Sequence, residues 1–400
     1  MQFDPFTAEA IEDPYPQYHR CRAATPLLWS DKLRSWVLFR HDDVAAFFRD
    51  DRQLSSDRSK AAKWKGPALP AGAPPLRTVA TDPPAHGPVR AMLTASLAPR
   101  VRTVGARVDE LIGVLLDRVG VAVGRIAERG ALDTAFDLID DFAYPLPINV
   151  IAELFDVPEA DRAQFRVWSH TIARGMDRFY SSGDAGRGLT EMGAYFYQLV
   201  LQHQGSGGED LIHRLLRAEH HGDRLSELEV VAMCTALVFG GHETTVNLIG
   251  NGLLALLRHP DELARLRAEP AAIDAAVEEL LRFDSPAQFI SRTAVVDFQW
   301  HDQPIKRGDA VLAALGAANR DPAVFDQPDR LDLARSPNPH LAFGLGTHFC
   351  PGAQLSRIEA RAAIPALLHR FPRLRLAESP PVRRPTAVLR GLEHLPLRVD

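Results

Sequence analysis

The segment 340–352, HLAFGLGTHFCPG, combines a lone cysteine with a glycine-bearing loop. Cys350 ends this loop, and residues with helical spacing follow it at once. Gly344 and Gly346 let the backbone adopt a positive φ or approach another body closely. Amides turned inward by such a loop, and free N–H groups at the start of the next helix, stabilise an anion. We therefore expect the pKa of the Cys350 thiol to be lowered, which suits a nucleophile or a metal ligand.

The pattern Phe343-Gly-x-Gly-x-His-x-Cys350-x-Gly352 resembles the haem-binding loop of the cytochrome P450 family, in which the cysteine sulfur is the axial ligand of haem iron. Each fixed position of that pattern is filled. The resemblance implies haem b (iron protoporphyrin IX) as the cofactor and Cys350 as the metal ligand. It further implies that Phe343, Gly344, His348 and Gly352 contact the cofactor.

Two other interpretations of the loop remain open at this point. The first is a glycine-rich turn around a buried cysteine. The second is a zinc site formed by His340, His348 and Cys350, although no second cysteine pair and no HExxH motif stands nearby.

A second chemical segment, Gly240-Gly-His-Glu-Thr-Thr245, lies in the middle of a long predicted helix. Each glycine inside a helix costs roughly 1 kcal/mol relative to alanine, so the pair needs a reason, such as room for a flat body. Thr244 can bond the carbonyl one turn back and hold a local distortion open. The segment is similar to the family's oxygen-binding groove, which implies that Glu243 and Thr244 relay protons and that Gly240 and Gly241 make room for O2. The alternative is a polar helix face beside a packing glycine pair.

The haem propionates need cationic or hydrogen-bonding partners. Asp82-Pro-Pro-Ala-His-Gly-Pro-Val-Arg90 places His86 and Arg90 four residues apart, on one side of a helix start. This segment resembles the family's propionate-binding stretch, and Arg292 and His348 match two further propionate partners. For each residue the alternative is an ordinary surface position.

Glu279-Leu-Leu-Arg282 places opposite charges three residues apart on one helix face. Such pairs are common on surfaces and contribute only about 0.2–1 kcal/mol there. In the family the ExxR pair is buried beneath the cysteine loop and is joined by an Arg or His from the following meander. We therefore assign Glu279 and Arg282 a structural role.

The family resemblance implies a monooxygenase that inserts one oxygen atom from O2 into an apolar small molecule. Macrolides, steroids, terpenes and fatty acids all remain open. Candidate substrate contacts are Leu69, Leu76, Val79, Ala80, Ala236, Leu237, Ala287, Phe289, Ile290, Val388 and Leu389.

No flavin or nicotinamide fingerprint is present, so electrons are expected from a separate ferredoxin or flavodoxin with its reductase. We expect this partner to dock on the cysteine side, with Arg100, Arg102 and Arg357 as candidate contacts. A peroxide-driven haem-thiolate enzyme and a non-catalytic haem sensor or ligand-binding protein are the alternatives. Pro351 stands where the family often has an aliphatic residue, and it removes one N–H near the sulfur.

The elements that must position these motifs predict a mainly α-helical fold with a small β portion, forming one domain over residues 1–400. Haem is expected between the long helix, 226–258, and the cysteine loop with its helix, in which Pro365 predicts a kink or a break. Other helices are expected at 15–23, 42–49, 88–129 with breaks, 145–155, 159–174, 189–204, 261–269 and 271–282. Strands are expected as a pair within 26–39, at 293–296, 298–301 and 310–314, and as a terminal pair within 388–399. The Pro-, Gly- and Ala-rich stretch 57–84 is expected to form a mobile lid.

The bulk composition is that of a globular protein with a large core, 46% hydrophobic and 24% charged. The net charge of −5 and the absence of a basic block give no indication of nucleic acid or membrane binding. The N-terminus lacks the pattern of a signal peptide, and three widely separated cysteines argue against a disulfide framework. We therefore expect a soluble, cytoplasmic monomer.

Overall fold

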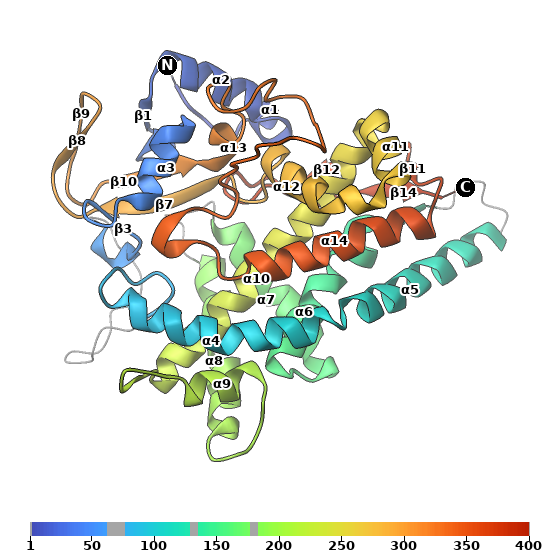
Figure 1. Cartoon of the computed structure of the whole chain (residues 1–400), viewed down its shortest axis with the longest axis horizontal. Coiled ribbons are helices and arrows are strands. Elements are labelled where there is room, and N and C mark those ends of the chain that lie inside the picture. The colour runs from blue at the N-terminus through green and yellow to red at the C-terminus, as the bar shows by residue number, and fades with distance from the viewer. Residues whose placement is uncertain (1, 62–76, 129–134, 177–182, 400) are drawn as a thin grey trace.

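The computed structural model of the chain describes residues 2–61, 77–128, 135–176 and 183–399. Its longest element is the helix α10, Glu227–Arg258. Ser226 accepts a hydrogen bond from the Glu229 amide and Glu229 accepts one from the Ser226 amide, so the predicted capping box is present. Helices α6, α7, α8, α12 and α14 all pack against α10 (Figure 1). Because α10 is surrounded in this way, most of its side chains are buried.

Most of the other helices lie close to the positions that the sequence predicts, but the short helices at 8–12, 211–217 and 315–318 were not expected. In chain order they are α1 Ala8–Glu12, α2 Tyr15–Ala24, α3 His41–Arg49, α4 His86–Gly105, α5 Val108–Glu128, α6 Pro145–Phe155, α7 Glu159–Met176, α8 Gly183–His203, α9 Leu211–Arg217, α11 Pro260–Ala268, α12 Ile273–Phe283, α13 Leu315–Ala318 and α14 Ala353–Arg370. A short π-helical turn, Ile139–Ala143, precedes α6. The helix α14 is continuous through Pro365, so of the two expected outcomes, a kink or a break, the break was wrong and the kink stays a prediction.

The β portion consists of one five-stranded sheet and several short strand pairs. The sheet has the order β1-β2-β10-β7-β3, with bounds Leu27–Ser30, Ser35–Leu38, Ala310–Ala314, Phe289–Ala294 and Leu54–Ser55. The pair β1–β2 confirms the two strands expected within 26–39, whereas β7 begins four residues before the strand predicted at 293. Two of the short pairs are hairpins: β5 Glu219–His220 with β6 Asp223–Arg224, and β8 Phe298–Trp300 with β9 Gln303–Ile305.

The sequence analysis expected the two C-terminal strands to pair with each other, and this was wrong. The strand β13, Leu392–His394, pairs with β12, Val382–Arg383. The strand β14, Pro396–Arg398, lies between β11, Arg375–Leu376, and β4, Ala135–Asp137. A single residue separates β13 from β14, too little chain for an ordinary hairpin turn, so each strand finds a partner elsewhere.

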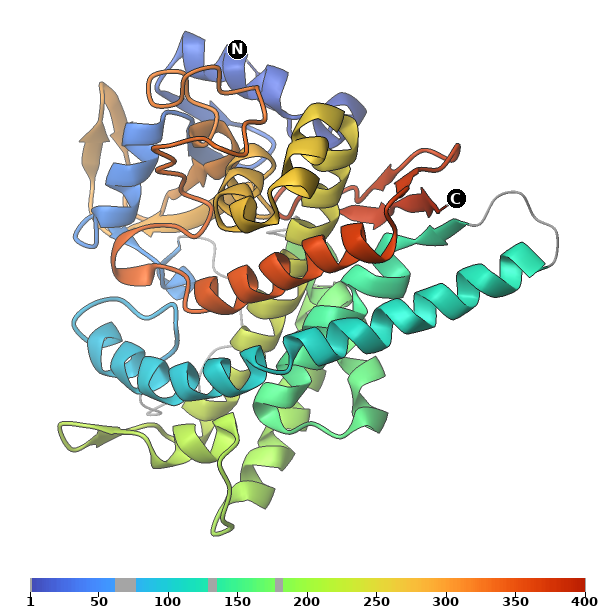
Figure 2. The ribbon, with the colours of Figure 1, turned by 45° about the vertical axis from the view of Figure 1, so that its right-hand side comes forward.

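The helices α4 and α5 run along one side of α14, while the five-stranded sheet and the N-terminal arm lie at one end of the molecule (Figure 2). The arm is anchored by an aromatic cluster in which Phe3 and Tyr18 contact Phe39 and Phe289. Within the described residues, no helix combines the length and the apolar character that a bilayer crossing demands.

Candidate functional site

The cysteine loop is shaped by two glycines in the left-handed region, Gly344 at φ 70° and Gly346 at φ 71°. A Cβ on Gly346 would lie 3.0 Å from the carbonyl oxygen of Phe48, so the loop also passes too close to α3 for a larger residue. The Cys350 amide donates to the Phe343 carbonyl at 3.0 Å, which closes the loop directly before α14. The chain therefore holds the Cys350 sulfur at a helix start by backbone geometry.

The surroundings of the Cys350 sulfur affect the pKa of its thiol in two opposite directions. Burial raises the pKa of the thiol, while the backbone N–H groups of Gly352 and Ala353 and the charge of Arg90 lower it. The net direction is upward, so the expectation of a lowered pKa was wrong for the protein chain by itself. The loop amides do point at the sulfur as expected, but removal from water outweighs them. A metal cation would reverse this balance, because a coordinating thiol is deprotonated.

The middle of α10 has a face that the described residues leave partly exposed. Leu237, Gly240 and Thr244, spaced by three and four residues, are partly or fully exposed on it; we call them the open face of α10. A Cβ on Gly240 would meet nothing within 4 Å. The Thr244 hydroxyl donates to the Gly240 carbonyl at 2.7 Å, as the sequence predicts. The open face thus offers room beside the backbone and a hydroxyl next to it.

Gly241 has a different role from its neighbour. A Cβ placed on it would lie 2.8 Å from Ile151 Cδ1, on α6. Its lack of a side chain serves helix packing, and the expectation that Gly241 also makes room for O2 stays a prediction. The two positions are 100° apart around the helix and therefore face different neighbours.

Glu243 is fully buried and lies away from the open face. Its carboxylate accepts hydrogen bonds from the Tyr144 hydroxyl and from Arg384 Nη1. Burial opposes its ionisation, yet Arg384, His242 and Tyr144 together hold the pKa of Glu243 below its usual value. Neither Tyr144 nor Arg384 was identified from the sequence. They lie 99 and 141 residues from Glu243 along the chain, and no local pattern marks them.

Four basic side chains gather beside the cysteine loop. The rings of His86 and His348 lie 4.4 Å apart, and burial together with the charges of His348 and Arg90 lowers the pKa of His86 to about 4. Arg292 is buried and donates to the carbonyl oxygens of Phe47 and Asp50. The charge of Arg90 acts on His86, and the charge of Arg292 acts on His348. All four residues expected to bind propionates therefore lie near one another.

This arrangement fits a haem. His348 Nδ1 lies 3.1 Å from the Val79 carbonyl oxygen, and its Nε2 is a buried polar atom without a hydrogen-bond partner. Arg292 Nη2 is also buried without an aligned hydrogen bond, although it lies 3.3 Å from Asp51 Oδ1. His348 Nε2, which can donate once the ring is protonated, and the buried Arg292 guanidinium are groups that a flat, doubly anionic, metal-bearing group would stabilise.

The helix α10 is held against α14 where these parts meet, since Thr245 and Ser356 share a buried hydrogen bond of 3.1 Å. Thr245 directly follows Thr244, and Ser356 lies near the start of α14, the helix that follows Cys350. The haem expected between the long helix and the cysteine loop would therefore be bounded by two elements in direct contact.

Comparison with known proteins shows the same family throughout the chain. The sequence model described as Cytochrome P450 matches residues 195–391. Cytochrome P450 107B1 of Saccharopolyspora erythraea is 40% identical over 379 residues, which cover 92% of this chain and 89% of that protein. Cytochrome P450 monooxygenase PikC of Streptomyces venezuelae is 39% identical over 401 residues, covering 96% and 91%. The chain belongs to the cytochrome P450 family. The structure of PksS, a cytochrome P450 of the Bacillus subtilis 168 bacillaene polyketide synthase, matches it with a TM-score of 0.86 and 34% identity over 100% of both chains.

The ExxR pair of this cytochrome P450 is buried as expected. Glu279 and Arg282 are both inaccessible to solvent and share two hydrogen bonds of 2.7 and 2.8 Å. Arg335 supplies the expected third member from the meander, 3.2 Å from Glu279. Arg282 also donates to the carbonyl oxygens of residues 319, 328 and 330, so the pair fixes the chain before the cysteine loop.

The candidate substrate contacts of this P450 fall into three groups. Ala287, Val388 and Leu389 pack together near Phe239 of α10, and Ala287 forms a β-bridge with Leu389. Leu237, Ala236, Val79, Ala80 and Ile290 are partly or fully exposed. Phe289 is only 2% exposed and lies in the aromatic cluster of the N-terminal arm, so the structure assigns it to the core instead. Leu69, Leu76 and most of the predicted lid lie outside the described residues.

The candidate docking arginines of this P450 differ in availability. Arg357 donates to both carboxylate oxygens of Glu278, at 2.6 and 2.7 Å, and stacks 4.5 Å from the ring centre of Phe343. Arg100 donates to the Glu153 carbonyl. Arg102 is exposed on α4, which packs against α14. Arg357 is therefore committed inside the protein, and Arg102 has the freest side chain of the three.

The alternative zinc set is not assembled. His340 Nε2 lies 3.0 Å from Glu278 Oε2, and His348 turns to the Val79 carbonyl. In the parts of the chain that the structure describes, the His, Cys, Asp and Glu groups whose ligand atoms converge within 4.8 Å are His203–Asp210–His213 and Asp137–Asp140–His394. Neither contains the cysteine.

Proposed function

We propose that this protein binds haem b through Cys350 and inserts one oxygen atom from O2 into an apolar small molecule. The observation that carries the proposal is the convergence of three features. These are a partly buried cysteine at a helix start, an open face on α10, and the buried Nε2 of His348 near the buried Arg292. A thiolate-ligated haem supplies O2 activation and favours O–O cleavage.

The chain's own residues would bind the cofactor and manage protons. His86, Arg90, Arg292 and His348 would bind the two propionates, because their donors gather on one side of the cysteine loop. The Thr244 hydroxyl on the open face would hold a proton close to the place of reaction. Glu243 would supply that proton only after leaving Arg384, since its carboxylate is now enclosed.

The substrate would lie along the open face. Leu237 on α10 and the nearby cluster of Ala287, Val388 and Leu389 are the apolar side chains that would contact it. An apolar compound would also displace poorly bound water from this surface, which favours binding. Compounds that shift the Soret band of the purified protein would identify the substrate class.

The test of haem ligation is the spectrum of the reduced protein with carbon monoxide. Thiolate ligation is expected to place the Soret maximum at a wavelength distinct from that of histidine-ligated haem. The Cys350→Ser variant should lose this band or the porphyrin itself. A maximum typical of histidine-ligated haem in the unsubstituted protein, or no bound porphyrin, would overturn the proposal.

Electrons would arrive from a separate ferredoxin or flavodoxin at the side of α4 and α14. Arg102 is the exposed contact of choice for an acidic partner. The Arg102→Glu variant should slow reduction by the partner and weaken its salt dependence, since steering by surface charge is screened by salt. Arg357 is an unsuitable test, because its loss would also remove both of its hydrogen bonds to Glu278 inside the protein. Unchanged reduction rates at low salt would contradict docking at this surface.

A further inference from the structure

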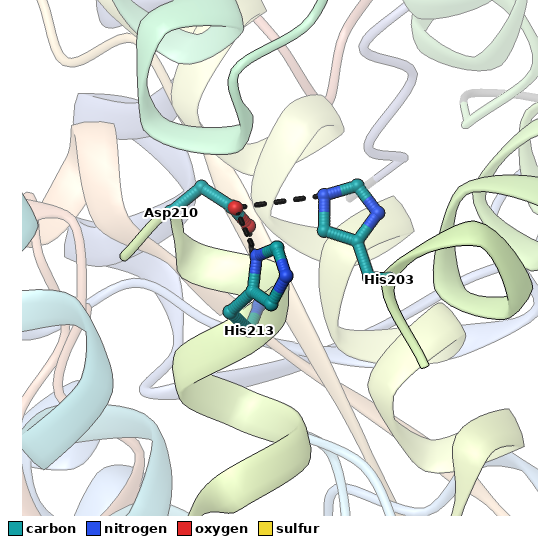
Figure 3. Close-up of side chains that lie close together, drawn as sticks. All are labelled: His203, Asp210 and His213. Atoms are coloured by element: carbon teal, nitrogen blue, oxygen red, sulfur yellow. Dashed lines mark hydrogen bonds and ion pairs between the residues drawn. The ribbon is translucent and has the colours of Figure 1, made fainter. Parts of the chain in front are cut away.

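A cluster of two histidines and one aspartate joins α8 to α9, far along the chain from the cysteine loop. His203 is the last residue of α8, Asp210 is the N-cap of α9, and His213 lies in the first turn of α9. Their side chains point toward one another (Figure 3). Each offers one ligand atom, and these atoms lie within 4.8 Å of one another. Asp210 and His213 are buried, and the side chain of His203 is 17% exposed.

The position of the His203 proton follows from its neighbours. Its Nδ1 lies 2.6 Å from the carbonyl oxygen of Leu199, which can only accept, so Nδ1 carries a proton. A neutral imidazole has one N–H, which leaves a lone pair on Nε2. This Nε2 lies 3.5 Å from Asp210 Oδ2. Either a proton on Nε2 or a bound metal cation would make this contact favourable.

His213 is arranged in a similar way. Its Nδ1 contacts the same Asp210 Oδ2, and its Nε2 lies 3.0 Å from the Ser206 hydroxyl. Ser206 Oγ also lies 3.0 Å from the His203 carbonyl oxygen, which can only accept its proton. His213 Nδ1 and Asp210 Oδ2 form a hydrogen bond, so a metal ion would bind there in place of the shared proton. Both rings thus direct one nitrogen at the same carboxylate oxygen.

We propose that His203, Asp210 and His213 bind one zinc ion. Two imidazole nitrogens and one carboxylate oxygen are a common zinc donor set, with bonds of about 2.0–2.2 Å. Tetrahedral bonds of that length separate neighbouring ligand atoms by about 3.4 Å, close to the 3.5 Å between His203 Nε2 and Asp210 Oδ2. His213 would turn slightly away from Asp210 to admit the ion, and a water would complete the fourth position.

The contacts around the three side chains are those of an oriented metal site. The carbonyl of Leu199 and the hydroxyl of Ser206 hold the two rings by their other nitrogens. Asp210 Oδ1 accepts from the amides of Ile212 and His213, at 2.9 and 3.1 Å, which leaves Oδ2 for the ion. A Cβ on Gly208 would lie 2.3 Å from the His213 ring, so glycine makes room for the imidazole.

The ion would connect the end of α8 to the start of α9, across the loop 204–209. Both helices pack against α10. Zinc would therefore add a direct link between two helices that already pack on α10, and it would act at a distance from the cysteine loop. The site is independent of the proposed oxygen chemistry.

The experiment measures zinc bound to the full-length, haem-loaded protein after equilibrium dialysis, with iron counted in the same sample. Two variants should each lose one zinc per haem or bind it at least ten-fold more weakly. His203→Gln removes one ligand without touching the cap of α9. Asp210→Asn keeps the cap, because asparagine also caps helices, but removes the charge. Zinc should also slow amide exchange over residues 199–213 in the unsubstituted protein only.

The matched control is His394→Gln, in the other histidine–carboxylate cluster, which should bind as much zinc as the unsubstituted protein. Equal zinc content in the unsubstituted protein, His203→Gln and Asp210→Asn would overturn the proposal and show that protons alone fill the gap. Loss of the zinc in His394→Gln would likewise overturn it, by placing the ion at the other cluster.

Discussion

Glu243 and Thr244 are neighbours in the sequence, but only Thr244 borders the open face of α10. Glu243 is fully buried and bonded to Tyr144 and Arg384, whereas the Thr244 hydroxyl lies beside Gly240. Two residues expected to act as one relay are therefore held in different environments. For a proton to pass from Glu243 to Thr244, the Glu243 carboxyl group must first leave Tyr144 and Arg384.

The hydroxyl of Thr244 can be tested by Thr244→Ala. We expect the variant to bind substrate and consume electrons while the fraction recovered in product falls roughly ten-fold, since positioned proton transfer contributes at least about that much. Peroxide and superoxide should rise in proportion. The measurement compares electron consumption with product for any compound that shifts the Soret band. Thr235→Ala is the matched control, because Thr235 makes the same bond one turn back at 2.9 Å within α10. Equal coupling in both variants would contradict the role of Thr244.

The ion pair of Glu243 with Arg384 predicts a large stability effect. Arg384→Ala leaves a buried carboxylate without its cation, which typically costs about 3–5 kcal/mol. Urea unfolding of the haem-loaded protein would measure this loss. The double variant Glu243→Gln/Arg384→Ala should recover part of it, because no buried charge then remains. If the stability losses of the single variants Arg384→Ala and Glu243→Gln add up to the loss of the double variant, the two side chains are not coupled.

Gly240 and Gly241 form a matched pair of sites in one helix. Gly240→Ala should raise the free energy of unfolding by about 0.5–1 kcal/mol, because alanine favours helix and its Cβ meets nothing within 4 Å. Gly241→Ala should gain less or lose stability, because Ile151 has to move from a Cβ only 2.8 Å away. Chemical unfolding of both variants checks the order. A greater stability of Gly241→Ala would contradict the assignment of Gly241 to packing.

The acid sensitivity of the protein should depend on Asp284. Burial by itself would raise its pKa, but Arg390 and Arg383, with Arg320 and Tyr15, lower the pKa of Asp284 to about 2. In the unfolded chain the pKa of an aspartate is about 3.9. The ionised Asp284 carboxylate therefore stabilises the fold above pH 4, and this contribution is lost as the pH falls toward 2. The stability difference between the unsubstituted protein and Asp284→Asn should narrow by about 1 kcal/mol between pH 6 and pH 3. Urea unfolding across that range measures it, and parallel curves would disprove the linkage.

Local patterns predicted the parts of the site whose chemistry depends on spacing. The cysteine loop, the capped helix α10 and the ExxR pair are each specified within about 30 residues, so the sequence alone indicated their presence. The burial of Glu279 and Arg282 followed from the family resemblance, because the pair by itself is no different from a surface pair.

The sequence by itself therefore determined the elements and most of the residues that could hold a haem. Only the tertiary structure decided what each side chain faces. Gly241 packs on Ile151, Phe289 joins the aromatic cluster of the N-terminal arm, Glu243 is bonded to Arg384, and β14 lies between β4 and β11. Each of these contacts joins residues that lie far apart along the chain. Propensity and periodicity describe a residue and its near neighbours, whereas such contacts are set by how the whole core packs.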